Sequence, residues 1–248
     1  MSTHVTCSEF GWRLGNQLFQ YAALFAYAYN KGKTIRLNER YKEEHLFKCF
    51  AINNIIFQNS VVQSPFKERQ FSFNHNLFSG DYDSICGYFQ SEKYFDSIKQ
   101  QLRQQLIFKV IGNNYKDHCF IHVRRMDYLK YTDIHPICTD EYYQNAIETV
   151  KKHMGSDTKF VVFSDDIDAC RKQYSSFKQS NVSFDTQDAY QTLYSMSTCN
   201  SSIIANSSFS WWGAWLSPSI ITVAPKNWFG SKGPKDTHDI YCKEWLCL

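Results

Sequence analysis

The chain has 248 residues, of which 43% are hydrophobic and 21% charged, so it is long enough for one large domain or two small ones with a substantial core. Its formal net charge of +3 and its scattered basic residues exclude the composition typical of nucleic-acid-binding proteins. The first residues lack the pattern of a signal peptide and no run approaches the ~20 apolar residues of a membrane span, so we expect a cytoplasmic protein without a membrane-spanning segment.

The N-terminal residues predict a β-loop-α-β unit. A strand is expected over 5–10, and the turn at 11–17 leads into a helix in which apolar side chains recur at steps of three and four residues. Gly32 ends this helix before a second strand, expected over 34–37. A glycine-containing loop before a helix exposes backbone N–H groups that can receive an anion or a sugar hydroxyl. On pattern alone, a glycine turn into a core helix is the commoner explanation.

The segment from 38 to 87 is less regular, and its sequence predicts no definite element. Beyond it, Ser91 is a candidate N-cap for a helix that would carry Tyr94, Ile98 and Leu102 on its apolar face. Glycine and asparagine at 112–114 then mark the predicted domain boundary.

The second half alternates between predicted strands and helices. Thr139 is the candidate N-cap of one of these helices. The strands are expected near 118–123, 159–163, 181–184, 202–205 and 220–223. This alternation is typical of a parallel, doubly wound sheet, in which ligands bind outside the carboxyl ends of the strands. Three polar clusters fall at such strand ends.

The first polar cluster follows the strand at 118–123. Arg124 and Arg125 point to opposite faces of an extended chain, so one guanidinium can face a cleft while the other braces it from behind. The rigid donor fork of arginine matches paired phosphate oxygens, which favours a diphosphate ligand. An ion pair with Asp127 that fixes the loop explains the pattern equally well. His122 shares a face with Arg124, and both a ligand contact and a core role remain open.

The second cluster is Ser164, Asp165 and Asp166, and it allows three interpretations. The aspartates could accept hydrogen bonds from the N–H groups of a base such as guanine. They could instead favour the dipole of a following helix. Asp166 and Asp168 also have the spacing of the Asp-x-Asp element of metal-dependent glycosyltransferases.

The third cluster begins at Asn206 and continues through a serine-rich run. The hydroxyls of Ser207, Ser208 and Ser210, together with backbone amides at a helix start, could receive a phosphate. The tryptophans that follow are expected to pack as a wall of the site.

These clusters and two N-terminal motifs resemble, in order and nearly from end to end, glycosyltransferase family 11, the α-1,2-fucosyltransferases. The motifs are Gly11-x-Arg13-Leu14-Gly15-Asn16-Gln17, Gly87-Tyr88-Phe89-Gln90-Ser91, His122-Val123-Arg124-Arg125-x-Asp127-Tyr128, Phe163-Ser164-Asp165-Asp166 and Asn206-Ser207-Ser208-Phe209-Ser210-Trp211-Trp212. Two positions depart from the family pattern, because Trp12 and Met126 stand where members often carry glycine. The chain is also short for the family.

The resemblance implies an α/β, GT-B-like fold of two facing Rossmann-like domains with parallel sheets. Residues 1–114 would form the acceptor-side domain and 115–225 the GDP-fucose-binding domain, while 226–248 would pack back on the N-terminal domain. The implied reaction transfers L-fucose from GDP-β-L-fucose to the 2-hydroxyl of a galactose in an oligosaccharide acceptor, with inversion. No metal and no other cofactor is expected.

The resemblance also implies residue roles. Arg124 would hold the β-phosphate of the leaving GDP, and Arg125 would support it. Asp127 would accept the acceptor proton or orient an arginine. His122 with Asp165 or Asp166 would read the guanine. The donor-binding set is expected to be Asn16, His122, Arg124, Arg125, Ser164, Asp165, Asp166, Asn206, Ser207, Ser208, Phe209 and Ser210.

Two alternatives from other classes remain at this stage. One is a non-catalytic sugar-nucleotide or glycan-binding protein on the same fold. The other is a metal-dependent glycosyltransferase that uses Asp166 and Asp168.

Overall fold

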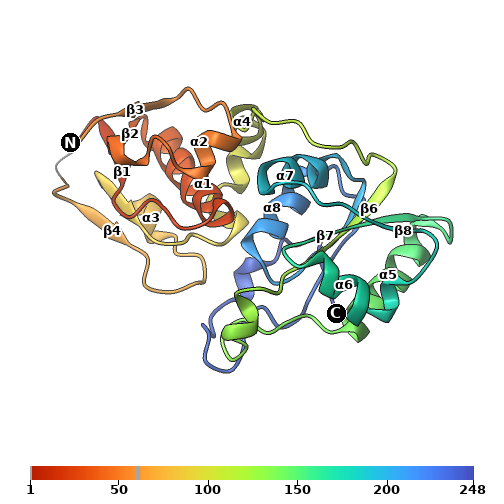
Figure 1. Ribbon diagram of the computed structural model, residues 1–248. Coiled ribbons are helices and arrows are strands. Elements are labelled where there is room, and N and C mark those ends of the chain that lie inside the picture. The colour runs from red at the N-terminus through yellow and green to blue at the C-terminus, as the bar shows by residue number, and fades with distance from the viewer. Residues whose placement is uncertain (1, 60–61) are drawn as a thin grey trace. The chain divides into compact units, whose positions relative to one another are not determined.

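The computed structural model describes residues 2–59 and 62–248, which form two α/β units (Figure 1). The first unit comprises the chain up to Lys109 together with Asp236–Cys242, and the second comprises Val110–Lys235 with Lys243–Leu248. In both units the strands pair in parallel, so the predicted α/β class with parallel sheets is confirmed.

The first unit is built on a sheet whose described strands run in the order β3-β2-β1-β5-β4. The strands are β1 (His4–Cys7), β2 (Thr34–Leu37), β3 (Ile55–Phe57), β4 (Pro65–Lys67) and β5 (Ser84–Cys86). The helices are α1 (Leu14–Lys31), α2 (His45–Cys49), α3 (Asn76–Ser79) and α4 (Lys99–Gln105). Helix α1 ends at Gly32, whose left-handed backbone (φ 62°) lets its N–H bond to carbonyls of the last turn. This is the end that the sequence predicts.

The helix predicted after Ser91 is not continuous. The chain forms two 3-10 turns, Glu92–Tyr94 and Asp96–Ile98, before α4 begins at Lys99. The Ser91 hydroxyl accepts the Lys93 N–H and so caps the first of these turns. Tyr94, Ile98 and Leu102 are nevertheless all buried, so the predicted apolar residues belong to the core although the helix is not continuous.

The second unit contains a sheet whose described strands run in the order β11-β10-β9-β6-β7-β8. The strands are β6 (His118–Val123), β7 (Lys159–Ser164), β8 (Val182–Phe184), β9 (Ser201–Ile203), β10 (Thr222–Ala224) and β11 (Leu246–Cys247). The helices are α5 (Asp140–Met154), α6 (Ile167–Gln173), α7 (Ala189–Thr198) and α8 (Ser208–Leu216). Strands β6 and β7 are almost wholly buried, as expected for parallel strands covered on both faces.

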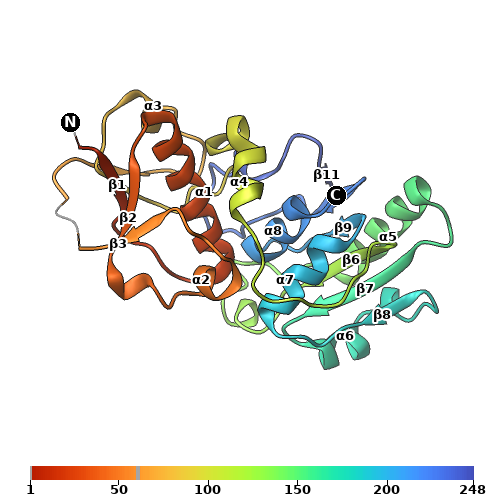
Figure 2. The same cartoon turned by 90° about the horizontal axis from the view of Figure 1, so that it is seen from above.

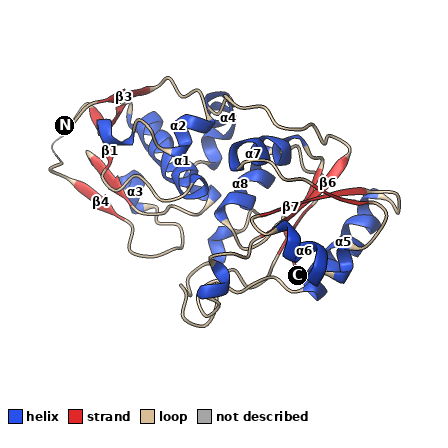
Figure 3. Ribbon diagram, in the orientation of Figure 1, coloured by secondary structure: helices blue, strands red, loops and turns tan. Residues whose placement is uncertain are grey.

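Helices cover both faces of this second sheet. Helices α5 and α6 lie on one face and α7 and α8 on the other (Figures 1 and 2), and the strand–helix alternation is visible in Figure 3. The Thr139 hydroxyl accepts the Tyr142 N–H at 3.2 Å and caps α5, so the predicted cap is confirmed. No helix of the described residues combines the length and the apolar character that crossing a bilayer requires.

In the first sheet β1, β2 and β3 are added in one direction, whereas β4 lies at the opposite edge and β5 is inserted between β4 and β1. In the second sheet the direction in which successive strands are added reverses once, at a switch point between β6 and β9. The crevice outside the carboxyl ends of the two strands at such a switch point is where open α/β sheets bind ligands. A functional site is therefore expected in the loops that follow β6 and β9, and the loops at the carboxyl ends of the adjacent strands β1 and β5 are a second candidate.

Candidate active site

The switch point of the second unit joins two of the predicted polar clusters. Strand β6 is paired with β9 through Ile121 and Ile203, so the loops that follow the two strands leave the sheet side by side. The Tyr128 hydroxyl donates a hydrogen bond of 2.9 Å to the Asn206 carbonyl and links these loops. Residues 124–128 and 206–210 are thereby brought to one edge of the sheet.

Arg124 is the first residue beyond β6, and two carboxylates hold its guanidinium. Its Nη2 lies 2.6 Å from an oxygen of Asp127, and its Nη1 lies 3.0 Å from an oxygen of Asp165. The guanidinium carbon lies 5.6 Å from the centre of the Tyr128 ring, at cation–π distance. The loop-fixing ion pair that the sequence allows is therefore present. Only 15% of the Arg124 side chain is exposed, so the contacts fix the direction of the donor fork at the switch point.

Arg125 points the other way, as the alternation of an extended chain predicts. It is 7% exposed, and its Nη1 donates a hydrogen bond of 3.2 Å to the Tyr174 hydroxyl. The guanidinium carbon lies 5.7 Å from the centre of the Tyr174 ring, and Nε lies 3.6 Å from Asp166. Arg125 therefore braces the loop from behind, and Tyr174 is a supporting residue that the sequence did not reveal because it lies far away in the chain.

His122 is a buried, neutral histidine. Its ring is 4% exposed and lies against the Phe209 ring, with 5.6 Å between centroids. Burial lowers its pKa to about 3, because the charged form would lose its hydration. Its Nδ1 is buried, and within residues 2–59 and 62–248 it has no hydrogen-bond partner. The ring therefore combines a core position with one unsatisfied polar atom.

The cluster after β7 consists of three residues that support the local backbone. The Ser164 hydroxyl accepts the Asp166 N–H at 3.0 Å, and Asp165 accepts the Arg125 N–H at 2.9 Å. Asp166 accepts the Ala169 N–H at 3.2 Å and is the N-cap of α6, so the helix-start interpretation is correct for this residue. Burial raises the pKa of Asp165, and the neighbouring Arg124 cation acts against that rise.

The Asp-x-Asp pair, Asp166 and Asp168, lies at the start of α6. Asp168 lies in the first turn of α6, after Asp166 has capped it. Across the described part of the chain, no three side chains of His, Cys, Asp or Glu come together in a group that could hold a metal ion.

The cluster after β9 holds its own loop together. The Asn206 side chain is buried and donates to the carbonyls of Pro136 and Trp228 at 3.0 and 2.9 Å. Ser207 is the N-cap of α8. Ser210 is fully buried, and its hydroxyl donates to two carbonyls of the loop.

Of the three serines that the sequence predicts as phosphate ligands, Ser207 and Ser210 are buried. Ser208 and Phe209 are half-buried at the first turn of the helix, so Ser208 is better placed for a phosphate than Ser210. Behind them Trp211, Trp212 and Trp215 pack with ring centroids 5.0–6.5 Å apart and form the expected wall.

Asn16 belongs to the first unit, where it lies in the first turn of α1. Its side-chain oxygen accepts a hydrogen bond of 3.0 Å from the Gln90 amide, which joins the loops after β1 and β5. Asn16 therefore lies at the carboxyl ends of the adjacent strands β1 and β5.

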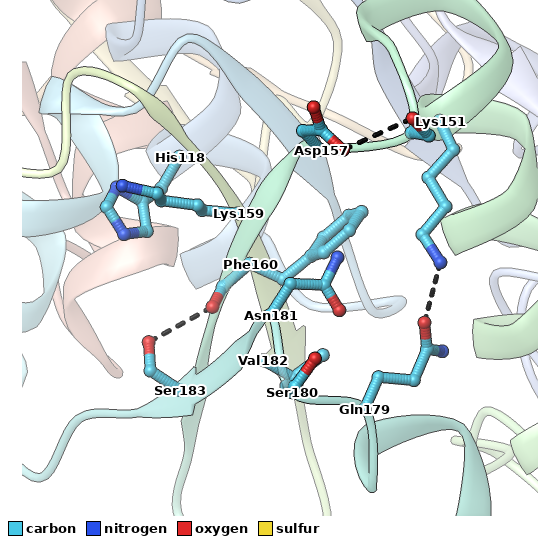
Figure 4. Close-up of a pocket in the computed structure, with 11 residues that line it drawn as sticks. His118, Lys151, Asp157, Lys159, Phe160, Gln179, Ser180, Asn181, Val182 and Ser183 are labelled. Atoms are coloured by element: carbon cyan, nitrogen blue, oxygen red, sulfur yellow. Dashed lines mark hydrogen bonds between the residues drawn. The ribbon is translucent and has the colours of Figure 1, made fainter.

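A cavity of about 680 Å³ lies elsewhere in the second unit. It is lined by residues at the amino ends of β6, β7 and β8, among them His118, Lys159 and Val182 (Figure 4). This is the edge opposite Arg124. The cavity is therefore separate from the candidate site.

The sequence matches the model of one protein family and is similar to known proteins. The model of the family described as glycosyl transferase family 11 matches residues 76–248. The chain is similar to Alpha-1,2-colitosyltransferase of Escherichia coli, with 31% identity over 87% of this chain and 89% of the relative. It is also similar to Galactoside 2-alpha-L-fucosyltransferase SEC1 of Bos taurus, with 23% identity over 82% of this chain and 62% of the relative.

A solved structure shares the fold. The α-1,6-fucosyltransferase NodZ, in a crystal soaked with GDP-fucose, superposes with a TM-score of 0.51 over 88% of this chain and 94% of its own. The sequence identity is 12%, so the likeness concerns the fold alone.

Proposed function

Because the chain belongs to glycosyl transferase family 11 and is a glycosyltransferase, we propose that it transfers L-fucose from GDP-β-L-fucose to the 2-hydroxyl of a galactose in an oligosaccharide. The transfer proceeds with inversion and needs no metal ion. The observation that carries this proposal is the Arg124 guanidinium, fixed by two carboxylates at the β6/β9 switch point. The name of the bovine relative supports fucose as the transferred sugar.

Inverting transfer is a single displacement. The acceptor hydroxyl attacks the anomeric carbon of fucose while the bond from that carbon to the β-phosphate oxygen breaks, and the electron pair leaves with GDP. Arg124 meets the charge that develops on the leaving phosphate, as a fixed donor that needs no reorganisation during the reaction. Arginine has five N–H donors, so pairing with two carboxylates leaves donors for phosphate oxygens. Ser208 and the first turn of α8 supply further donors beside it.

Recognition of guanine falls to the residues around β7. The base presents adjacent N–H donors, which a carboxylate accepts. Asp166 is 32% exposed and Asp165 is 17% exposed, so Asp166 is the more accessible partner. His122, whose unsatisfied Nδ1 is buried at the same edge, is the other residue that we assign to guanine recognition.

Asp127 could either orient Arg124 or accept the proton of the acceptor hydroxyl. Its contact with Arg124 at 2.6 Å supports an orienting role, and its place in the same loop also suits a base that receives the acceptor proton. We expect Asp127→Asn to lower the turnover number at least 100-fold while GDP binding stays within a few-fold of wild type. Steady-state rates and GDP titration measure the two effects. An equal loss in GDP binding would assign Asp127 to holding the site together.

Metal independence is part of the proposal, and the ligand arrangement supports it. Among the described residues, Asp166 and Asp168 have no third His, Cys, Asp or Glu side chain grouped with them that could complete a metal site. We expect the transfer rate in excess EDTA to equal that in buffer, and a loss that Mn²⁺ or Mg²⁺ restores would favour the metal-dependent alternative.

A second donor follows from the similarity to the colitosyltransferase of Escherichia coli. Colitose is the 3-deoxy counterpart of L-fucose, so the two donors differ by one hydroxyl. A site that hydrogen-bonds this hydroxyl rejects the analogue lacking it by up to about 10⁴–10⁵-fold. The test compares kcat/KM for GDP-fucose and GDP-colitose, with GDP-mannose and UDP-galactose as controls. A preference for GDP-fucose supports the proposal, a preference for GDP-colitose replaces fucose by colitose, and turnover of either excludes a non-catalytic binding protein.

A further inference from the structure

Two strained residues lie in the loops that follow the adjacent strands β1 and β5 of the first unit. Among the described non-glycine residues, only Trp12 (φ 72°) and Phe89 (φ 53°) have a positive φ. Trp12 lies in the loop after β1, and Phe89 lies in the loop after the neighbouring β5. A bulky side chain in this backbone region costs of order 1–3 kcal/mol and persists only where the surroundings enforce it.

Buried side chains enforce the shape of the first loop. Gln17 is wholly buried and donates a hydrogen bond of 2.8 Å to the Trp12 carbonyl. Gln20 is also buried, and its side-chain oxygen accepts the Gly11 N–H at 3.0 Å. The Gln20 amide donates to the Gly87 carbonyl at 3.2 Å and so ties the first loop to the second.

A carboxylate enforces the shape of the second loop. Glu68 accepts the N–H groups of Tyr88 and Phe89 at 2.7 and 2.9 Å. Its other oxygen accepts the Tyr94 hydroxyl at 3.0 Å. The backbone of both loops is therefore held by specific hydrogen bonds.

The strain displays an aromatic side chain without burying it. Trp12 is 68% exposed, although a tryptophan gains most from burial. Its ring lies 6.2 Å from that of Tyr88, which stacks on Phe71 at 5.6 Å with an interplanar angle of 21°. We call Trp12, Tyr88 and Phe71 the aromatic platform. Trp12 and Tyr88 lie in the loops after β1 and β5, which the Asn16–Gln90 hydrogen bond joins, at the carboxyl ends of strands where parallel sheets bind ligands.

We propose that the aromatic platform binds the pyranose ring of the acceptor galactose, an inference that rests on the proposed function. One face of galactose presents C–H groups that stack on an aromatic ring, while its hydroxyls need amide donors and acceptors of the kind that Asn16 and Gln90 carry. Three partly buried rings offer far less than the roughly 800 Å² that each partner buries in a stable protein complex. A sugar ring is the occupant that fits both the size and the chemistry.

The test replaces the ring while relieving the strain. Trp12→Gly takes a positive φ without cost, so its melting temperature should equal or exceed that of wild type. We expect its KM for lactose to rise about tenfold at saturating GDP-fucose, because the stacking contact is lost. Trp12→Phe should recover most of the affinity. Tyr29→Ala, which removes an exposed aromatic ring near the opposite end of α1, is the matched control and should keep the wild-type KM.

Two comparisons separate the possible results. The rate of GDP release without acceptor depends on the donor sugar alone. If Trp12→Gly lowers this rate as much as it lowers the rate with lactose, Trp12 contacts the donor, and the acceptor assignment is overturned. An unchanged KM in Trp12→Gly would overturn the platform itself.

Trp12 is the most exposed tryptophan of the chain, so lactose should protect the fluorescence of the GDP-bound protein from iodide quenching. This binding measurement needs no turnover. Protection in a protein inactive with GDP-fucose would refute the proposed reaction while supporting the platform, and no protection would contradict the platform.

Discussion

At the scale of single residues, the proposed chemistry depends on the shape of one guanidinium. Lysine would keep the charge of Arg124 beside Asp127 and Asp165 but would lose the planar fork that binds two phosphate oxygens. We therefore expect Arg124→Lys to lose about 10²–10³ in turnover, and Arg124→Ala to abolish transfer, while both variants remain folded. Rates and thermal melting of purified variants measure this. Arg171→Lys, at a cation–π contact with Phe184 in the same unit, is the matched control. Near wild-type turnover in Arg124→Lys would contradict the role of the fork.

His122 makes a second prediction at this scale, which concerns pH. Burial lowers its pKa to about 3, whereas a histidine of the unfolded chain titrates near 6.5. Between these pH values the unfolded state binds a proton that the folded state does not. The contribution of neutral His122 to the free energy of unfolding is therefore present above about pH 6.5 and is lost as the pH falls towards 3. Relative to His122→Asn, wild type should lose up to about 1.4 kcal/mol per pH unit over this range. Denaturant unfolding of both proteins at pH 7.5 and 4.5 measures the difference. Parallel pH dependence of the two proteins would contradict a buried, neutral His122.

At the scale of elements, the turn after β5 predicts a different pH dependence. Burial raises the pKa of Glu68, although the backbone N–H groups of Tyr88 and Phe89 act against the rise. The folded state therefore binds the Glu68 proton more tightly than the unfolded state, so this contribution is present at low pH and is lost as the pH rises through the raised pKa. Glu68→Gln keeps an acceptor for the turn and cannot ionise. The melting temperature of Glu68→Gln, measured relative to wild type, should rise as the pH increases from 4 to 7. A difference in melting temperature that stays constant across this range would contradict the raised pKa of Glu68.

Elements were predictable where local signals sufficed. Helix α1 has a long apolar periodicity and a terminal glycine, and its end at Gly32 follows from both. Strands β3, β4 and β5 have three residues each, which is too short to show an alternation, so the segment from 38 to 87 gave no signal. Asp166 was ambiguous for another reason. A helix cap and a metal ligand require the same carboxylate, and only the Ala169 N–H at 3.2 Å distinguishes them.

At the scale of the whole molecule, alternation along the chain predicts parallel sheets but does not give the order of the strands. That order places the switch point of the second sheet at β6/β9 and sets β5 beside β1 in the first sheet, and it arises from contacts between residues far apart in sequence. The supporting contacts of the site have the same origin. Glu68 holds Tyr88 and Tyr174 holds Arg125 across many residues, so neither carried a sequence signal. Tyr88 and Arg125, the residues that these contacts hold, lie within motifs that the sequence does show.

The central claim is that the chain transfers fucose through the site at the β6/β9 switch point without a metal. The most direct measurement is product formation from GDP-fucose and lactose in excess EDTA, with wild type and Arg124→Lys side by side and the product analysed by NMR. We predict a trisaccharide with an α-linked fucose on O2 of galactose, formed by wild type at the same rate with and without EDTA and about 10²–10³-fold more slowly by the variant. A β-linked product, a requirement for added metal, or equal rates for the two proteins would contradict the account.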